Sequence, residues 1–250
     1  MASQIKTSQE IQAMREGGKI LGQCLKETAA LAKPGVSTME LDQFAEQFLR
    51  DHNGTPTFKG YQGFPGTLCT NINEVVVHGI PSKDEILKEG DLIAIDCGFH
   101  YKGMHTDSTI LVGVGQISPE KQKVIKAAEE TLSAAIDFIR PGIRVGDLSH
   151  VIEETIRKHG YSPVEELTGH GVGHKLHEPP HIPNHYEEPG PVLKENMTLA
   201  IEPIFAIGSP KIKTLSDKWT IVTTDGSLSA QIEHTIAITE TGCEIITERN

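Results

Sequence analysis

The chain has 250 residues, 37% of them hydrophobic and 23% charged, with a formal net charge of -11 at pH 7. It is long enough for a large buried core, it has no apolar run that could span a membrane, and its acidity disfavours a broad surface for DNA or other nucleic acids. The first residues lack the apolar core of a signal peptide, and the four cysteines form neither a CxxC pair nor a disulfide-like framework, so we expect a cytoplasmic protein with reduced thiols.

Four helices are predicted from apolar residues that recur at helical spacing. The first begins at Ser8, which we expect to cap it, and the second begins with Ser37 and Glu40 at the spacing of a capping box. Ser118 opens the third helix, and a Pro-Gly pair separates the two helices of each half. The predicted helices cover residues 8–31, 37–50, 118–138 and 145–159.

Short segments with strand character follow each pair of helices. Such an arrangement, present twice, predicts an α+β fold in which the helices cover one side of a curved sheet. Residues 208–226 have no counterpart in the first half, and we interpret them as an insertion. The predicted strands are residues 74–77, 92–96, 108–113, 198–202, 220–223 and 232–238.

Much of this pattern is an internal repeat. Residues 88–96, which end in Asp96, are echoed by residues 194–202, which end in Glu202. A repeat of this length indicates one domain built from two similar halves rather than a solenoid. Two related strands would then bring Asp96 and Glu202 toward each other near a pseudo-twofold axis. We expect a single domain over residues 1–250, with halves at roughly 8–113 and 118–240.

Four acids lie in strand-like segments with apolar neighbours, and they match pairwise between the halves. A buried carboxylate costs several kcal/mol unless it is paired or bound to metal. Two divalent cations would balance four carboxylates, and shared ligands would hold the cations roughly 3.5–4 Å apart. The alternative, surface acids on amphipathic strands, is weakened by the pairwise match. The four acids are Asp96, Asp107, Glu202 and Glu233.

Five histidines are concentrated in residues 170–185. A zincin helix is excluded because the motif's glutamate is missing and three glycines would disrupt the helix. A metal-scavenging tract is the other alternative, but glycine- and proline-rich turns hold the side chains in defined directions. We interpret one or two of these histidines as site residues. His177 precedes Glu202 as His78 precedes Asp96, so both are candidates.

Six motifs, in a fixed order, cover nearly the whole chain: residues 78–81 (His-Gly-Ile-Pro), 91–98, 106–107 (Thr-Asp), 169–173 (Gly-His-Gly-Val-Gly), 201–203 (Ile-Glu-Pro) and 231–235 (Gln-Ile-Glu-His-Thr). Together they resemble type I methionine aminopeptidases. The sequence has no zinc-finger extension, so it is similar to the short form typical of prokaryotes. The resemblance implies the pita-bread fold, whose pseudo-twofold symmetry agrees with the repeat.

The resemblance also implies a dinuclear metal site. Asp107 and Glu233 would bridge two divalent ions, Asp96 would hold one of them, and His170 with Glu202 would hold the other. Oxygen ligands with one imidazole suit Co, Mn, Fe or Zn.

By the same resemblance, the enzyme removes the N-terminal methionine of nascent proteins and peptides and favours a small second residue. A hydroxide bridging the ions would attack the first carbonyl, with Glu202 as general base and then general acid. His78 and His177 would be catalytic residues that stabilise the developing negative charge.

A methionine pocket and one further site, for a monovalent cation, follow from the resemblance. The family often carries a cysteine where Phe58 stands and an aromatic residue where Leu176 stands, so this chain departs from the family at two pocket positions. Simple core packing is the alternative for the aromatic residues. A monovalent cation is implied near Asn73, Val75 and Ser229. The predicted substrate-binding residues are Phe58, Tyr61, Phe64, Cys69, His78, Leu176, His177 and Trp219.

The insertion places Lys211, Lys213 and Lys218 close together on an acidic protein. These lysines form either an ordinary solvated loop or a contact with ribosomal RNA near the exit tunnel, where nascent chains emerge. We expect the protein to be a monomer.

Two competing functions remain. Aminopeptidase P and prolidase share the fold, but they usually carry a large N-terminal domain that this sequence lacks. A non-catalytic peptide- or RNA-binding member of the fold would have lost ligands, whereas all five are present. Metal content and hydrolysis of a methionine peptide separate the three.

Overall fold

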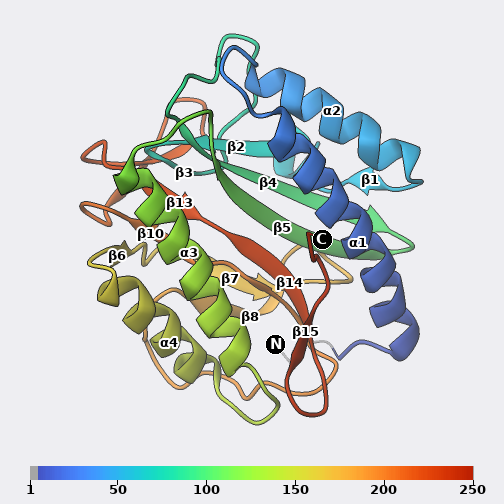
Figure 1. Ribbon diagram of the computed structural model, residues 1–250. Coiled ribbons are helices and arrows are strands. Elements are labelled where there is room, and N and C mark those ends of the chain that lie inside the picture. The colour runs from blue at the N-terminus through green and yellow to red at the C-terminus, as the bar shows by residue number, and fades with distance from the viewer. Residues whose placement is uncertain (1–4, 250) are drawn as a thin grey trace.

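In the computed structural model, which describes residues 5–249, four helices lie on one side of a curved antiparallel sheet (Figure 1). The helices match the predicted ranges to within about one residue. Ser37 and Ser118 cap the second and third helices as predicted. The first cap was wrong by one residue: Thr7, not Ser8, accepts the backbone N–H of Glu10 and completes a capping box. The helices are α1 (Ser8–Leu31), α2 (Thr38–Asp51), α3 (Pro119–Phe138) and α4 (Val145–Lys158).

The large sheet carries the first-half strands on one side and the second-half strands on the other. Its order is β1-β4-β5-β14-β9-β7-β8, with β2 paired to β4 and β15 paired to β14, and all pairs are antiparallel. Its strands are β1 (Thr55–Pro56), β2 (Leu68–Ile72), β4 (Leu92–Tyr101), β5 (Met104–Gly113), β7 (Thr168–Gly171), β8 (Glu178–Pro183), β9 (Thr198–Ile201), β14 (Glu233–Ile238) and β15 (Cys243–Ile245).

Two small sheets complete the fold. The first has the order β13-β10-β6, and the second has the order β11-β12-β3. The predicted insertion contains β11 and β12, and β12 pairs with β3 of the first half. The remaining elements are β3 (Val75–Val77), β6 (Ser162–Pro163), β10 (Ile204–Ala206), β11 (Ile212–Thr214), β12 (Ile221–Thr223), β13 (Ser229–Gln231) and a 3-10 turn (Tyr61–Gly63).

Strands β4 and β5 are longer than predicted, because they form a continuous hairpin. Lys102 and Gly103, between the two strands, both have positive φ angles, of 48° and 83°. A two-residue turn of this kind matches the twist of antiparallel strands. Every residue from Leu92 to Tyr101 therefore pairs with a residue of β5.

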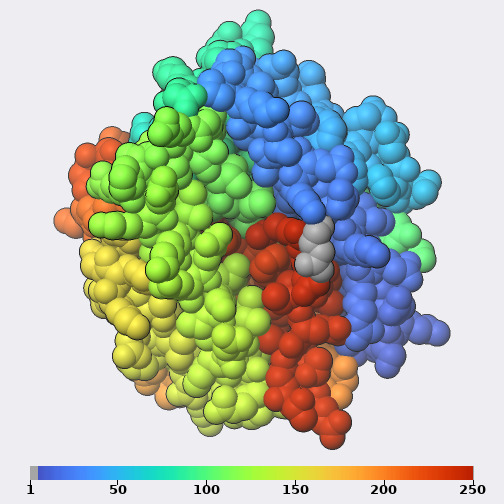
Figure 2. Space-filling model, viewed as in Figure 1, coloured from blue at the N-terminus to red at the C-terminus, as the bar shows by residue number. Residues whose placement is uncertain are grey.

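The apolar core lies between the helices and the large sheet. Ile93, Ile95 and Cys97 of β4 pack in one buried cluster with residues of α1 and α2, while Ile236 of β14 packs in another with residues of α3 and α4. Figure 2 shows the four helices and the C-terminal segment covering this face. Since strand side chains alternate between faces, residues between these positions point to the opposite face of the sheet. Within residues 5–249, no helix is long and apolar enough to cross a membrane.

Candidate active site

The register of the large sheet brings the predicted acids to one face. Asp96 is paired with Thr109, and Thr109 is also paired with Glu233. Directly paired residues share a face, as do residues two apart on one strand. Asp107 therefore lies on the same face as Thr109, together with Asp96 and Glu233.

The same argument extends to the second half. Ala200 pairs with Thr235 of β14 and with His170 of β7, so His170 lies on the face of Glu233. Glu202 follows Ala200 by two residues; it lies just beyond the end of β9, one residue outside the strand in which we predicted it. Pairing therefore places four predicted ligands on this opposite face of the sheet, and Glu202 continues the alternation just beyond β9.

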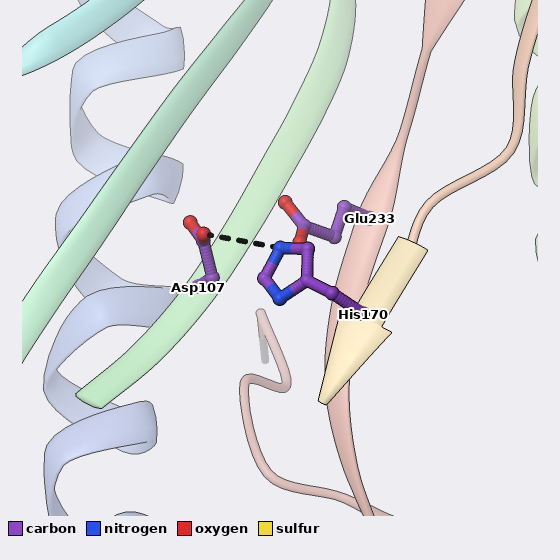
Figure 3. Close-up of side chains that lie close together, drawn as sticks. All are labelled: Asp107, His170 and Glu233. Carbon is purple, nitrogen blue, oxygen red and sulfur yellow. Dashed lines mark ion pairs between the residues drawn. The ribbon is translucent and has the colours of Figure 1, made fainter. Parts of the chain in front are cut away.

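Three of these side chains form a compact cluster. Ligand atoms of Asp107, His170 and Glu233 lie within 4.8 Å of one another, and all three residues are buried. Figure 3 shows them pointing toward one another from β5, β7 and β14, with 3.9 Å between His170 Nε2 and Asp107 Oδ2. His170 Nδ1 is hydrogen-bonded to Gly171 O at 2.9 Å, and this contact leaves Nε2 free to act as a ligand.

Asp96 and Glu202 are held beside this cluster by one amide that the sequence analysis missed. Gln231 Nε2 donates to Glu202 Oε1 at 2.6 Å and lies 3.5 Å from Asp96 Oδ2. Asn71 in turn donates to Gln231 Oε1 at 2.7 Å, which fixes the orientation of the amide. The repeat predicted that Asp96 and Glu202 approach each other, and in the structure both carboxylates lie beside the same amide group, that of Gln231.

Side chains also connect β5 to β14, because the backbone pairing of these two strands covers only two residue pairs. The Thr235 hydroxyl lies 2.9 Å from Asp107 N and 2.7 Å from Asp107 O, and Thr109 Oγ1 donates to Glu233 Oε2 at 2.9 Å. The guanidinium of Arg249 donates to the backbone carbonyls of Thr109 and Glu233. Arg249 was not predicted; its sequence separation from Thr109 hides the contact.

The electrostatics of the cluster favour bound cations. Burial, and then the neighbouring carboxylates, raise the pKa of Asp107 and of Glu233 well above their ordinary range. Burial raises the pKa of Asp96 to about 7, and burial together with Asp96 raises the pKa of Glu202 to about 8. Burial lowers the pKa of His170 to about 3, so its ring is neutral, as a metal ligand must be.

Unpartnered oxygens show that the residues present fit divalent metal ions. Among the described residues, Asp96 Oδ1, Asp107 Oδ1 and Glu233 Oε1 are buried without a hydrogen-bond partner. Such atoms are costly unless something satisfies them. Carboxylate oxygens with one imidazole are a donor set that divalent transition metals accept.

These groups line a cavity of about 350 Å³ that is apolar at one end. All eight predicted substrate-binding residues and all five predicted ligands line it. Phe58, Phe64, Cys69 and Leu176 form a buried cluster at the apolar end. Trp219 from the insertion packs edge-on against Phe64, with ring centroids 5.2 Å apart. Seven further lining residues escaped the sequence analysis: Gln62, Val77, Glu166, Leu167, Thr168, His181 and Ile204.

Both predicted catalytic histidines line this cavity. His78 has a left-handed backbone, with φ of 59°, a strained conformation that is concentrated at functional sites. His177 Nδ1 lies 3.2 Å from the hydroxyl of Tyr61. Burial lowers the pKa of His78 and, more strongly, that of His177, to about 4. Both rings are therefore neutral near pH 7.

The residues predicted around a monovalent cation also come together. Ser229 Oγ lies 3.2 Å from Asn73 O and 3.0 Å from Val75 O. The three predicted lysines of the insertion are exposed, in and around β11.

Comparison with known proteins identifies the family. A family model for metallopeptidase family M24 matches residues 12–240. Methionine aminopeptidase 1 of Bacillus subtilis is 47% identical over 244 residues, which cover 97% of this chain and 98% of that protein. The crystal structure of methionine aminopeptidase from Thermotoga maritima matches with a TM-score of 0.97 and 40% identity, covering 99% of this chain and 100% of that one.

A prolidase from Pyrococcus horikoshii shares the fold with a TM-score of 0.79 at 24% identity, and the match covers 98% of this chain but 64% of the prolidase. These neighbours have the pita-bread fold, so the predicted fold class is confirmed. The family and the cluster of Asp107, His170 and Glu233 together indicate an enzyme that uses divalent metal. The chain belongs to metallopeptidase family M24 and, within it, to the methionine aminopeptidases.

Proposed function

We propose that this protein removes N-terminal methionine from peptides and from nascent chains in the cytoplasm, with a preference for a small second residue. The supporting observation is the cavity in which five metal-binding side chains adjoin an apolar pocket. Its similarity to methionine aminopeptidases is nearly full-length.

Two divalent ions are the proposed cofactors. Asp96, Asp107, His170, Glu202 and Glu233 would hold them, with Asp107 and Glu233 shared between both. When bound, such ions polarise the scissile carbonyl and activate a water molecule near neutral pH.

Glu202 is the proposed proton carrier. Its carboxylate lies in the cavity, where the amide of Gln231 fixes one of its two oxygens. A carboxylate held in this way takes a proton from the attacking water and later delivers it to the leaving amine. Asp96 is the other carboxylate near this amide. We assign it to metal binding alone.

His177 is the proposed donor to the developing oxyanion, and His78 also lines the cavity. When the Tyr61 hydroxyl donates to His177 Nδ1, the neutral ring carries its proton on Nε2. That N–H can stabilise negative charge in the transition state without being ionised.

The apolar end of the cavity is the proposed methionine pocket. We expect metal-loaded enzyme to hydrolyse Met-Gly-Met, and apolar contacts of this kind discriminate by only about 1–3 kcal/mol per methylene. A norleucine peptide should therefore be cleaved more slowly but measurably, and a phenylalanine peptide poorly, because Trp219 and Phe64 limit the width. The measurement is kcat/KM for the three peptides with Mn, Fe, Co and Zn in turn. Equal rates for methionine and phenylalanine would contradict this pocket, and cleavage of Xaa-Pro bonds alone would favour the prolidase function.

The exposed lysines of the insertion are a proposed contact with ribosomal RNA. Charge reversal, Lys211→Glu with Lys213→Glu and Lys218→Glu, should weaken co-sedimentation with ribosomes at low salt, because contacts to phosphates release counterions. Hydrolysis of Met-Gly-Met should be unchanged. Identical co-sedimentation of the variant and the wild type would show that the loop is ordinary surface.

We further propose that Asn73, Val75 and Ser229 bind a monovalent cation through their converging oxygens. The active unit is proposed to be a monomer, with residues 1–250 as one catalytic domain built from two similar halves.

A further inference from the structure

A buried ion pair lies directly behind the histidine-bearing loop, here called the 173–178 loop. Lys6 Nζ is 2.8 Å from Glu178 Oε2, and the two side chains are only 1% and 2% exposed. Burying two charges carries a large desolvation penalty, so a pair of this kind is weak evidence for a contribution to stability. Its position suggests another role.

The 173–178 loop links His170 to His177, two of the histidines that line the cavity. It follows β7, which carries His170, and it ends with His177 and then Glu178, the first residue of β8. His177 lines the cavity, whereas Glu178 is buried against Lys6. Because His177 directly precedes Glu178 in the chain, a displacement of Glu178 displaces His177 with it.

Glu178 also organises the loop backbone. Its second oxygen, Oε1, accepts the backbone N–H of Lys175 at 2.9 Å. The carbonyl of Gly173, at the start of the loop, accepts the backbone N–H of His105 at 2.7 Å. The Glu178 carboxylate thus connects the end of the loop to Lys175, in the middle of the loop, and to Lys6.

Lys6 reaches this carboxylate from the segment that precedes α1. Its backbone N–H donates to Asn196 O at 2.8 Å, which anchors the segment beside the turn before β9. Its side chain passes so close to Gly173 that a Cβ there would lie 2.2 Å from Lys6 Cε. A side chain at position 173 would collide with Lys6, so the glycine leaves the space that the lysine side chain occupies.

We infer that the Lys6–Glu178 ion pair is a positioning device for His177, so that the segment before α1 is a working part of the active site. The inference rests on the proposed function, since it gives His177 a role in catalysis. Without Lys6, the Glu178 carboxylate would be buried without its cation, and the loop would have to open to hydrate it. His174 also approaches Glu178 Oε1, at 3.8 Å, but it is 37% exposed and hydrogen-bonded to Glu10.

The test compares Lys6→Met with Lys102→Met. Lys102 forms a 2.6 Å ion pair with Glu16 of α1, but both side chains are exposed, so its loss should leave kcat unchanged. Lys6→Met should lower kcat for Met-Gly-Met on the order of 10²-fold, since a displacement of about 1 Å costs this much. We expect a smaller change in KM and unchanged Mn²⁺ affinity by calorimetry. A merely structural pair would lower the melting temperature and leave kcat of the folded, metal-loaded protein at the wild-type value, which would overturn the inference.

A double variant separates the charge from the packing. Lys6→Met with Glu178→Gln removes the unpaired carboxylate but keeps an acceptor for the Lys175 amide, so part of the lost kcat should return. Equal kcat in the single and double variants would show that the lysine acts by packing alone. If Lys6→Met does not fold, Glu178→Gln, which leaves the ammonium without its carboxylate, provides the same comparison with Lys102→Met.

Hydrogen exchange keeps this inference distinct from the proposed function. Lys6→Met should speed amide exchange in residues 173–178 and leave α3 unchanged, whether or not the wild type cleaves Met-Gly-Met. A wild type without activity would refute the proposed function alone, and unchanged exchange in the loop would refute the positioning role alone.

Discussion

Glu202→Gln is expected to reduce kcat for Met-Gly-Met by at least about 10³-fold, because general acid–base catalysis contributes about 10²–10⁴-fold and a carboxamide does not take the water's proton. The substitution preserves size and one acceptor oxygen, so the contact with Gln231 Nε2 is retained. The measurement is steady-state kinetics at saturating metal, with calorimetric Mn²⁺ titration to confirm that the variant is loaded.

Two controls make this result specific. Glu165→Gln makes the same chemical change at an exposed residue that does not line the cavity, and kcat should be unchanged. Glu202→Ala also removes a proposed metal ligand, so it should lose both hydrolysis and metal affinity. A fully loaded Glu202→Gln enzyme with wild-type turnover would refute the proton-carrying role.

The parts of the site that the sequence predicted are those set by local periodicity. Alternation along a strand put Asp96 on an apolar face, and pairing in the sheet put Glu233 on the same face. The repeat predicted that Asp96 and Glu202 would approach each other, and the structure joins them through Gln231. Strand alternation within about ten residues, together with the match between the two halves, was therefore sufficient for the acids.

The parts that sequence reasoning missed depend on distant contacts. Lys6 and Glu178 are separated by 172 positions, and no local pattern marks Lys6 as buried. Gln231 has no signal beyond its position two residues before Glu233. The length of β4 was underestimated because a turn of Lys102 and Gly103 was not recognised. The cap of α1 was missed although its signal is local: Glu10 stands three residues after Thr7 and completes a capping box, which Ser8 could not form.

The metal-free protein is expected to lose stability as pH rises from about 6.5 to about 8, and added Mn²⁺ should restore it. Folding raises the carboxyl pKa of Asp96 from 3.8 to about 7 and that of Glu202 from 4.5 to about 8. Buried histidines oppose this trend up to about pH 6.5, because folding lowers the pKa of His170 to about 3 and that of His177 to about 4. Above pH 6.5 these histidines are neutral in both states, whereas Asp96 and Glu202 ionise in the unfolded chain before they do in the folded one, so each added pH unit favours unfolding until the folded pKa is passed. The loss should be on the order of 1–2 kcal/mol per group between pH 6.5 and pH 8, measured by urea denaturation of EDTA-treated protein from pH 6 to pH 9.

One substitution tests whether the acidic cluster is the source of this loss. Asp107→Asn removes a buried carboxylate whose pKa burial raises well above its ordinary range. It should therefore stabilise the metal-free protein at pH 8, while it abolishes activity and weakens the stabilisation by Mn²⁺. Asp84→Asn, at an exposed position, removes the same charge from an acidic surface and should change none of these three quantities. Stability of the metal-free wild type that is flat or rises between pH 6.5 and pH 8 would contradict the prediction. The expected result would show that the fold tolerates a destabilising cluster of carboxylates because bound cations neutralise it in the working enzyme.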